Sequence, residues 1–513
     1  MKRDLSWFDL MWFGIGSIMG AGIFVLTGEA ARNNAGPAVV LSYLIAGIAA
    51  ILSVFCYTEF AVELPVAGGS FSYLRVELGD FVAFIAAGNI LFEYVVSGAG
   101  VARSFTSYFA TLCNHEPNSF RFYVSSMSEG YNYLDPIAIV ISIVVCVIAC
   151  FSIKGSSLFN KLASITHTLV LVFILIAGLT KINTSNFTTN FAPFGVSGIM
   201  KASSMLFFAY IGFDGIATLA EETKNPARDI PIGLVSSIVI VIVTYCTLSA
   251  TLCMMQPYTQ IDPDASYTMA FKAVGFSWAQ YIVAFGALEG MFTVLLANII
   301  GQARYFTHIG RTHMAPPFLA SIHEKTGTPL NATIVMTVAN SIVAFFTSLD
   351  VLANLLSIAT LFIFSLVSLA LIVRRYYVAG QTTKTDHRKL IAFLVLIVGS
   401  SIASGAYWKV TDGKSWMGYA IIGPIWVLAT LGLQLTVKQA RKPKMWGIPV
   451  MPWVPSASIA LNLFIMGSVD NASFVRFLVW TVLLMIYYVF IGLHASYDAA
   501  KDMERLTNIE AAN

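Results

Sequence analysis

Charged residues are scarce in this sequence of 513 residues. They make up 11% of the chain, and hydrophobic residues make up 57%. A soluble globular protein carries about 25% charged residues, because charged side chains cover much of its water-exposed surface. The composition therefore excludes an ordinary soluble enzyme or binding module and indicates a membrane protein.

The sequence also lacks the residue patterns of metal sites and catalytic centres. No combination of a nucleophile with a nearby base stands out, and the net charge of +3 indicates no particular partner. The cysteines show no metal-type spacing, and five of the six lie in apolar runs, where cysteine packs as a small hydrophobic residue. They are Cys56, Cys113, Cys146, Cys150, Cys246 and Cys253. We expect no enzymatic activity, no cofactor, no metal and no nucleic-acid partner.

Long apolar runs, in contrast, recur along the whole chain. A run of about 18 or more apolar residues is a candidate membrane helix. We predict an all-α polytopic membrane protein of fourteen spans, with short loops and no soluble domain. The spans are residues 5–30, 37–63, 80–112, 135–152, 160–180, 198–220, 231–255, 277–303, 331–346, 351–373, 389–408, 417–437, 453–468 and 474–494.

The first span holds more glycine than a helix tolerates. Its segment 14–24, GIGSIMGAGIF, contains Gly14, Gly16, Gly20 and Gly22, and each glycine costs a helix about 0.5–1 kcal/mol against alanine. Backbone that leaves the helix within a membrane must be buried in protein or line a wet cavity. The segment predicts a broken helix whose free N–H and C=O groups bind something small and polar. The alternative is close helix packing through small residues, as in Gly16-xxx-Gly20.

The sixth span, five spans later, contains a second predicted interruption. Gly212 and Gly215 bracket Asp214, which we expect to brace this helix, within an otherwise apolar segment. Interrupted helices at matching positions of two five-helix halves indicate an inverted-repeat transporter with its site at the membrane midplane. Half-helix N-termini suit a carboxylate, and freed carbonyls suit an ammonium. An α-amino acid is a small molecule that carries both a carboxylate and an ammonium group.

The distribution of positive charge predicts the orientation in the membrane. With the N-terminus inside, 21 of the 30 lysine and arginine residues fall in cytoplasmic segments, eight fall outside, and Arg103 lies within a span. Cytoplasmic loops carry the excess of Lys and Arg, so both termini are expected in the cytoplasm. We interpret the basic run 438–444 as a topology anchor that touches anionic lipid.

Four motifs resemble those of a known family. GIGSIMGAGIFVLTG (14–28), followed by the Gly-Pro-Ala of 36–38, resembles the first-helix signature of the amino acid–polyamine–organocation (APC) superfamily. Segment 207–234 resembles its sixth helix and the following loop, and segment 301–329 resembles the loop after its eighth helix. Segment 92–104 resembles the third helix of its cationic amino acid transporter branch. The plant-type members are the most similar, and the resemblance covers nearly the whole chain.

This resemblance implies a fold. It implies ten core helices in a five-plus-five inverted repeat with discontinuous helices 1 and 6, followed by four C-terminal transmembrane helices, which agrees with the count of spans. We expect residues 1–380 to form the transporter core. Residues 381–513 are expected to form the four additional helices and a short cytoplasmic C-terminus.

The resemblance also implies the substrate-binding residues. The first-helix backbone that receives the substrate carboxylate is matched by Ile18, Gly20, Ala21 and Gly22. The sixth-helix backbone that receives the α-ammonium is matched by Phe208, Ala209 and Ile211. Phe208 also matches the aromatic residue that covers the bound substrate. From the residue alone, lipid-facing packing would be the preferred interpretation of this phenylalanine.

Glu93 lies in the middle of the third span, and an ionisable residue there is a functional candidate by default. Its carboxylate would pair with a cationic substrate side chain or titrate with a coupled proton. The alternative is a structural pair with Arg103. Ten residues correspond to about 15 Å along a helix, too far for a direct pair on one helix. We therefore expect Glu93 in the site.

His167, in the fifth span, matches the position where proton-coupled relatives keep a lysine beside the broken first helix. Histidine suits proton coupling because its unperturbed pKa is about 6.5. The alternative is a neutral histidine bonded to a backbone carbonyl. The proton-coupling candidates are therefore His167 and Glu93, whereas Glu289, a second acid within a span, has no assigned role.

Together these features predict a secondary active transporter of amino acids. We expect proton-coupled uptake of the cationic amino acids arginine, lysine and histidine, at the plasma membrane or else at a vacuolar or endosomal membrane. The partners are then the amino acid substrate, protons and the lipid bilayer. The alternatives are a broader or neutral amino acid permease and an amino acid receptor built on the same fold. An ion channel is disfavoured, because the sequence has no repeated selectivity loop or ring of pore charges.

Overall fold

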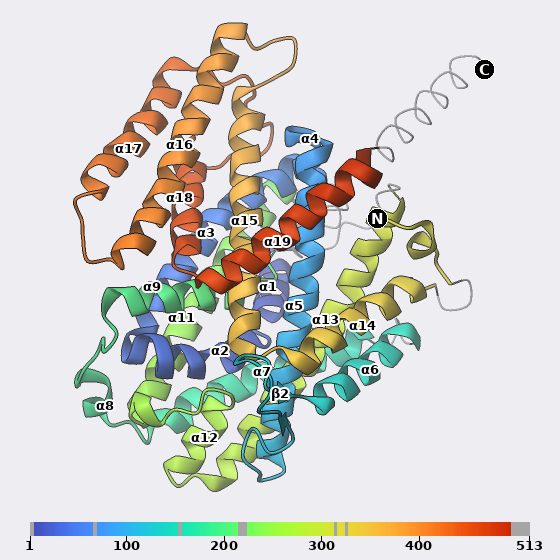
Figure 1. The fold of residues 1–513 in the computed structure, drawn as a ribbon, viewed down its shortest axis with the longest axis vertical. Coiled ribbons are helices and arrows are strands. Elements are labelled where there is room, and N and C mark those ends of the chain that lie inside the picture. Colours follow the sequence, from blue (N-terminus) through green and yellow to red (C-terminus); the bar gives the residue numbers. More distant parts are fainter. Residues whose placement is uncertain are drawn as a thin grey trace.

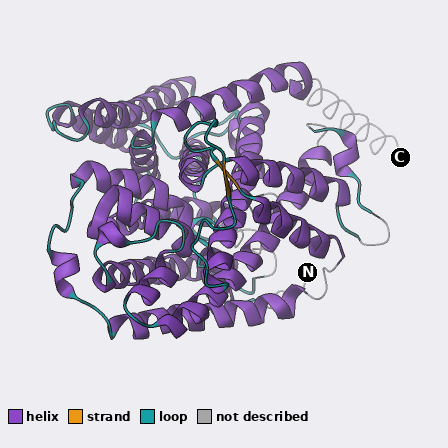
Figure 2. Ribbon diagram, turned by 60° about the horizontal axis from the view of Figure 1, so that its bottom comes forward, coloured by secondary structure: helices purple, strands orange, loops and turns teal. Residues whose placement is uncertain are grey.

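The protein is an assembly of helices (Figure 1), seen here in a computed structural model. It describes residues 5–64, 69–151, 156–213, 223–311, 315–323 and 327–493, without the side chains of 151–164; Asp214 lies outside these residues. Figure 2 shows helices throughout, with one small hairpin among them. In this hairpin β1 (Phe122–Tyr123) pairs antiparallel with β2 (Tyr133–Leu134).

The first span is two helices, as predicted. α1 (Trp7–Ile18) begins with a capping box, in which the Ser6 backbone N–H donates to the Asp9 carboxylate at 2.9 Å and the Ser6 side chain accepts from the Asp9 N–H. It ends at Ile18, and α2 (Gly22–Glu29) begins after a short segment of non-helical backbone. A single turn of helix, η1 (Ala30–Ala35), continues from α2.

The sixth span is interrupted as well. α9 (Gly195–Leu206) narrows into the 3-10 turn η3 (Phe207–Tyr210), after which Ile211 is extended. Gly212 follows with a φ of +119°, a backbone conformation that glycine adopts and other residues avoid. The described residues therefore confirm that the sixth helix is broken after Leu206.

The remaining core elements surround these two spans (Figure 1). They are η2 (Gly36–Ala38), α3 (Val39–Glu63), α4 (Gly69–Leu78), α5 (Asp80–Leu112), α6 (Pro136–Phe151), α7 (Ser156–Leu179), α8 (Thr184–Thr188), α11 (Pro226–Met255), η5 (Tyr258–Gln260), α12 (Ser266–Ala273), α13 (Ser277–Arg311), η6 (Pro317–Ala320), α14 (Leu330–Phe346) and α15 (Leu349–Tyr376). α5 and α13 pack along each other, and α11 packs on both α1 and α3.

Within the described residues, eight segments are long and apolar enough to cross a membrane. They are Gly22–Glu63, Asp80–Leu112, Pro226–Met255, Ser277–Arg311, Leu349–Tyr376, Lys384–Thr411, Tyr419–Thr436 and Asn471–Gly492. Shorter apolar helices occupy Pro136–Cys150, Ile165–Leu179, Leu330–Phe346 and Trp453–Gly467. Every predicted span contains a helix of the structure, which confirms the polytopic helical class. The number of fourteen crossings stays a prediction.

Four helices follow the core: α16 (Lys384–Thr411), α17 (Tyr419–Thr436), α18 (Trp453–Gly467) and α19 (Asn471–Tyr487), the last extended by η7 (Tyr488–Gly492). In Figure 1, α16, α17 and α18 stand together beside α15, whereas α19 crosses in front of it. A hydrophobic cluster joins the end of α15 to this group through Ile372, Tyr376, Leu390, Leu433 and Ile459. The division near residue 380 stays a prediction.

The basic run 438–444 lies against the core rather than standing free. The Arg441 guanidinium lies 3.3 Å from the Glu77 carboxylate, and the backbone N–H of Lys444 donates to Glu63 at 2.9 Å. Beside them the buried pair Arg375–Glu59 is closed at 2.6 Å. These contacts hold the run to α3, α4 and α15, and a contact with anionic lipid stays a prediction.

Candidate substrate site at the two helix breaks

The two broken helices touch at their breaks. A Cβ added to Gly22 would lie 2.6 Å from the Ala209 Cα, and one added to Gly212 would lie 2.6 Å from the Ser17 carbonyl oxygen. Real Cβ atoms essentially never come within 3.0 Å of another group. Gly20 is equally tight against Val294 of α13. The break in the first helix is therefore confirmed, and Gly20 and Gly22 also permit close packing, whereas Gly16 of the alternative motif is exposed. The binding role of the break stays a prediction.

One tyrosine hydroxyl joins the two breaks. Tyr245 of α11 is fully buried, and its hydroxyl lies 3.0 Å from the Ile18 carbonyl oxygen and 3.1 Å from that of Ala209. A phenol carries one proton, so the two carbonyls share this donor. The sequence analysis missed Tyr245. The signal available was a tyrosine in an apolar span, since a buried tyrosine hydroxyl usually finds a partner.

Other buried tyrosines brace the same region. The Tyr108 hydroxyl donates to the Phe24 carbonyl at 3.1 Å, and the Tyr210 hydroxyl donates to the Tyr43 carbonyl at 2.8 Å. The rings of Tyr43, Tyr210 and Tyr245 lie within 6.4 Å of one another, centre to centre. These contacts fix the backbone on either side of the breaks from α3, α5 and α11.

A small cavity lies beside the breaks. Its walls come from α2, α5, α15 and η3, and they include Val25, Val96, Ser97, Phe208 and Leu352. The cavity has a volume of about 10 Å³, which is room for about one water molecule. This conformation is therefore closed to an amino acid. Phe208 lines the cavity, and its covering of a bound substrate stays a prediction.

Glu93 lies one helical turn from this cavity. It is half-buried on α5, and Val96 and Ser97, which line the cavity, follow it by three and four residues. Residues at these spacings share one face of a helix. The competing partner Arg103 is bound elsewhere, because its guanidinium donates to the Ala344 carbonyl at 3.0 Å and to the Tyr133 carbonyl at 3.1 Å.

His167 lies against the first break, as expected from the sequence. Its buried ring contacts Gly290 of α13 and packs edge-on against Phe24, with 5.6 Å between ring centres. It also lies near the backbone of Met19 and Gly286. Neither ring nitrogen reaches a hydrogen-bond partner within the described part of the chain. The alternative of a histidine bonded to a backbone carbonyl stays open, since the backbone of Met19 and Gly286 lies beside the ring.

Glu289 precedes the glycine that contacts His167. Both of its carboxylate oxygens are buried, and neither finds a hydrogen-bond partner among the residues that the structure describes. A carboxylate without a partner in an apolar environment is strongly disfavoured in its charged form. The position beside Gly290 gives Glu289 a place near the site, but no contact of its own shows a role.

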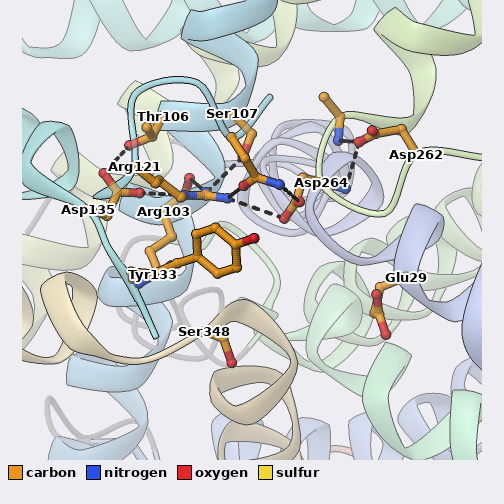
Figure 3. A network of polar contacts seen from close by, with 12 residues as sticks. Glu29, Arg103, Thr106, Ser107, Arg121, Tyr133, Asp135, Asp262, Asp264 and Ser348 are labelled. Carbon is orange, nitrogen blue, oxygen red and sulfur yellow. Dashed lines mark hydrogen bonds and ion pairs between the residues drawn. The ribbon is translucent and has the colours of Figure 1, made fainter. Parts of the chain in front are cut away.

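An ionic network lies outside the predicted site (Figure 3). Arg121 lies between two acids, 3.0 Å from Asp135 and 3.5 Å from Asp264, and it donates to the Arg103 carbonyl at 2.8 Å. Nearby, the Asp262 carboxylate accepts the backbone N–H of Asp264 at 2.9 Å. Burial raises the pKa of Asp262 above its ordinary value. This network ties two loops to α5, and the sequence analysis did not find it.

Comparison with known proteins agrees with this architecture. Residues 5–423 match the family model described as amino acid permease, and residues 446–496 match the one described as the C-terminus of that family. The chain is 61% identical over 501 residues to cationic amino acid transporter 1 of Arabidopsis thaliana, an alignment that covers 98% of this chain and 84% of that protein.

Two further Arabidopsis thaliana proteins are similar over the same length. Cationic amino acid transporter 5 is 55% identical over 500 residues, which cover 98% of this chain and 88% of that protein. Cationic amino acid transporter 8, vacuolar, is 50% identical over 500 residues, which cover 98% of this chain and 84% of that protein. The chain is therefore an integral membrane transporter of the plant-type cationic amino acid transporter family, within the amino acid–polyamine–organocation superfamily.

Proposed function

We propose that this protein imports the cationic amino acids arginine, lysine and histidine together with protons. The two helix breaks then form the substrate site. The observation that carries this proposal is the meeting of the breaks, where Gly22 touches Ala209 and the Tyr245 hydroxyl reaches the carbonyls of Ile18 and Ala209. This contact supports the proposal, because it brings backbone of the first and sixth spans to one place.

The first break supplies donors for the substrate carboxylate. The first N–H groups of α2 have no acceptor within the helix, and the N-terminus of a helix carries partial positive charge. Gly20, Ala21 and Gly22 stand at this N-terminus, next to Ile18. A carboxylate placed there would accept hydrogen bonds from backbone alone, so its binding would not depend on the substrate side chain.

The second break supplies acceptors for the α-ammonium. In η3 and the extended residue after it, the α-helical pattern of hydrogen bonds ends: the Phe208 carbonyl accepts the Ile211 N–H at 3.1 Å, and the Ala209 carbonyl accepts the Tyr245 hydroxyl. We propose that the carbonyls of Phe208, Ala209 and Ile211 receive the ammonium through their remaining lone pairs. A carbonyl oxygen has two lone pairs, so that of Ala209 is able to accept from the ammonium while Tyr245 still donates to it. The Phe208 ring lines the cavity and would cover the substrate.

Glu93 is proposed to meet the cationic end of the substrate side chain. It lies one turn from Ser97 on the face of α5 that reaches the cavity, and the Arg103 side chain, its alternative partner, is bound to the carbonyls of Ala344 and Tyr133. A half-buried carboxylate binds a cation more strongly than an exposed one, since water screens it less. Glu93 would then select cationic over neutral amino acids.

His167 is proposed to carry the coupled proton, with Glu93 as the other candidate. Its ring packs on Phe24 and lies near Met19, so a charge on the ring would act on the first break directly. The proton drives transport only if the outward-open and inward-open states bind it with different affinity. We propose operation at the plasma membrane with both termini in the cytoplasm, so that the acidic side is outside.

Uptake by proteoliposomes tests this function. The purified protein is supplied with labelled arginine, lysine, histidine, glutamine and leucine, with and without a pH gradient, at a clamped membrane potential. We expect accumulation of the three cationic amino acids only when the outside is acidic. Binding without uptake would indicate a receptor. Equal uptake of all five amino acids would indicate a broad permease, and uptake that does not depend on the pH gradient would indicate a carrier without proton coupling.

The variant His167→Asn identifies the proton site in the same assay. Asparagine keeps much of the shape of the ring but does not titrate near neutral pH. We expect arginine exchange to persist while accumulation against the gradient is lost. A variant that keeps the wild-type response to the gradient would make His167 a packing residue and leave Glu93 or Glu289 as the proton site.

A further inference from the structure

A group of carboxamides is buried between α5, α13 and α14, away from the breaks. Asn340 of α14 and Gln302 of α13 are fully buried, and Asn298 lies one turn before Gln302 on the same face of α13. Among the described residues, neither end of the Asn340 and Gln302 amides has a hydrogen-bond partner, nor does the Asn298 side-chain oxygen. None of the three belongs to the proposed substrate site.

These unpaired groups are hard to reconcile with a dry interior. A buried polar atom without a partner loses its hydrogen bonds to water and gains none in return. Lipid cannot replace them within a membrane. Two complete amides and one further oxygen therefore indicate that a small polar molecule shares the space.

Gly98 of α5 lies at the point where these groups converge, and the Asn340 amide packs directly against its backbone. A Cβ added to this buried residue would overlap the Asn340 side-chain nitrogen and would lie 3.3 Å from the Asn298 side-chain oxygen. A donor on α14 and an acceptor on α13 thus face one point on α5. At that point α5 presents Gly98, which has no side chain.

We propose that this cluster of amides is a binding site for ordered water, bridging Asn340 to Asn298 and, one turn further, to Gln302. Water both donates and accepts, which matches a set of amides that offers both functions. An ion would need an opposite charge when buried, and the three side chains are neutral. The bridging water holds α14 in register on α5 and α13.

Radiolytic hydroxyl labelling of the purified full-length protein tests the proposal, because buried side chains beside bound water are oxidised where dry ones are not. Met336 lies one turn before Asn340 on α14 and is 4% exposed, and Met291 on α13 is fully buried. We expect Met336 to be oxidised several-fold faster than Met291. Equal rates for the two methionines in the wild-type protein would overturn the proposal without any variant.

Two variants and a control test whether the labelling of Met336 depends on this cluster of amides. Asn340→Leu keeps the size but removes the hydrogen bonds, and Gly98→Ala pushes the Asn340 amide out of its place. Both should slow the oxidation of Met336 to the rate of Met291. Gly100→Ala is the control, since a Cβ there would meet only Leu349 Cδ1, at an ordinary 3.8 Å. It should leave the labelling unchanged. Fast labelling in folded Asn340→Leu would contradict the assignment.

Thermal unfolding gives an independent readout on Asn340→Leu. If water satisfies the amides, the leucine leaves Asn298 and Gln302 with an incomplete network, and the melting temperature falls. If the amides are bare, removing one of them relieves an unpaired group, and the melting temperature rises. A rise would therefore also overturn the proposal.

Discussion

The two helix breaks use glycine for different reasons. In the first, Gly20 and Gly22 provide space, since a side chain would meet Val294 or the backbone of Ala209. In the second, Gly212 also provides conformation, because its φ of +119° is one that other residues avoid. The first break is a short gap between two α-helices, and the second passes through a 3-10 turn and an extended residue.

This difference matches the two ends of an amino acid. A short gap before a helix leaves N–H groups free at the start of α2, whereas a helix that unwinds gradually leaves carbonyls free at its end. Tyr245 contacts a carbonyl of each break and makes the two into one unit. We expect each break to fail in its own way when it is altered.

The largest effect is expected from filling the first break. Gly22→Val places its Cβ 2.6 Å from the backbone Cα of Ala209, and backbone cannot move aside as a side chain does. Uptake of every amino acid should be abolished in proteoliposomes. Gly399→Val on α16, where a Cβ would meet nothing within 4 Å, controls for the substitution. Normal transport by well-folded Gly22→Val would refute the assignment of the site.

A large effect is also expected in the second break, from strain and contact together. Gly212→Ala forces a positive φ on a residue with a side chain, which costs roughly 1–3 kcal/mol, and adds the contact with Ser17. Gly275→Ala has a φ of +82° but no atom within 4 Å of the new Cβ, so it reports strain alone. Arginine uptake should fall at least about tenfold more in Gly212→Ala than in Gly275→Ala. A tenfold difference corresponds to about 1.4 kcal/mol. Equal losses would show that the contact between the breaks is unimportant.

Glu93→Gln tests the recognition of the substrate side chain separately from the recognition of its carboxylate and α-ammonium at the breaks. On the proposed assignment the breaks bind groups common to all amino acids, so this variant should weaken the binding of cationic substrates alone. Exposed ion pairs contribute about 0–1 kcal/mol, and an unpaired buried charge costs about 3–5 kcal/mol. For a half-buried residue we expect about a tenfold loss for arginine and lysine relative to glutamine. Parallel losses in competition assays would indicate a structural or proton role instead.

The smallest effect is expected from Tyr245→Phe, which cuts the link between the breaks but keeps the packing of the ring. One hydrogen bond contributes about 0.5–1.5 kcal/mol net. The half-saturating arginine concentration should therefore rise about two- to tenfold, by the same factor for neutral substrates. An effect confined to cationic substrates would place the hydroxyl beside the substrate side chain rather than at the breaks.

The sequence predicted the features that depend on local composition. The glycine pattern located both breaks, and the rise of the helix correctly argued against a pair between Glu93 and Arg103. It could not predict contacts between distant segments. Tyr245 meets Ile18 and Ala209 across 227 and 36 residues, and Arg121 meets Asp264 across 143. A polar residue in an apolar span shows that a partner is needed, but only the packing of the helices decides which one.

Competition by substrate analogues tests the central claim most directly, because it leaves the protein unaltered. Agmatine is arginine without its carboxylate, and a desamino analogue of arginine lacks the α-ammonium. Hydrogen bonds to charged groups contribute about 1.5–3 kcal/mol each, so each analogue should inhibit arginine uptake about tenfold to a hundredfold more weakly than unlabelled arginine does. If either analogue inhibits as strongly as arginine, the break assigned to the missing group does not bind substrate.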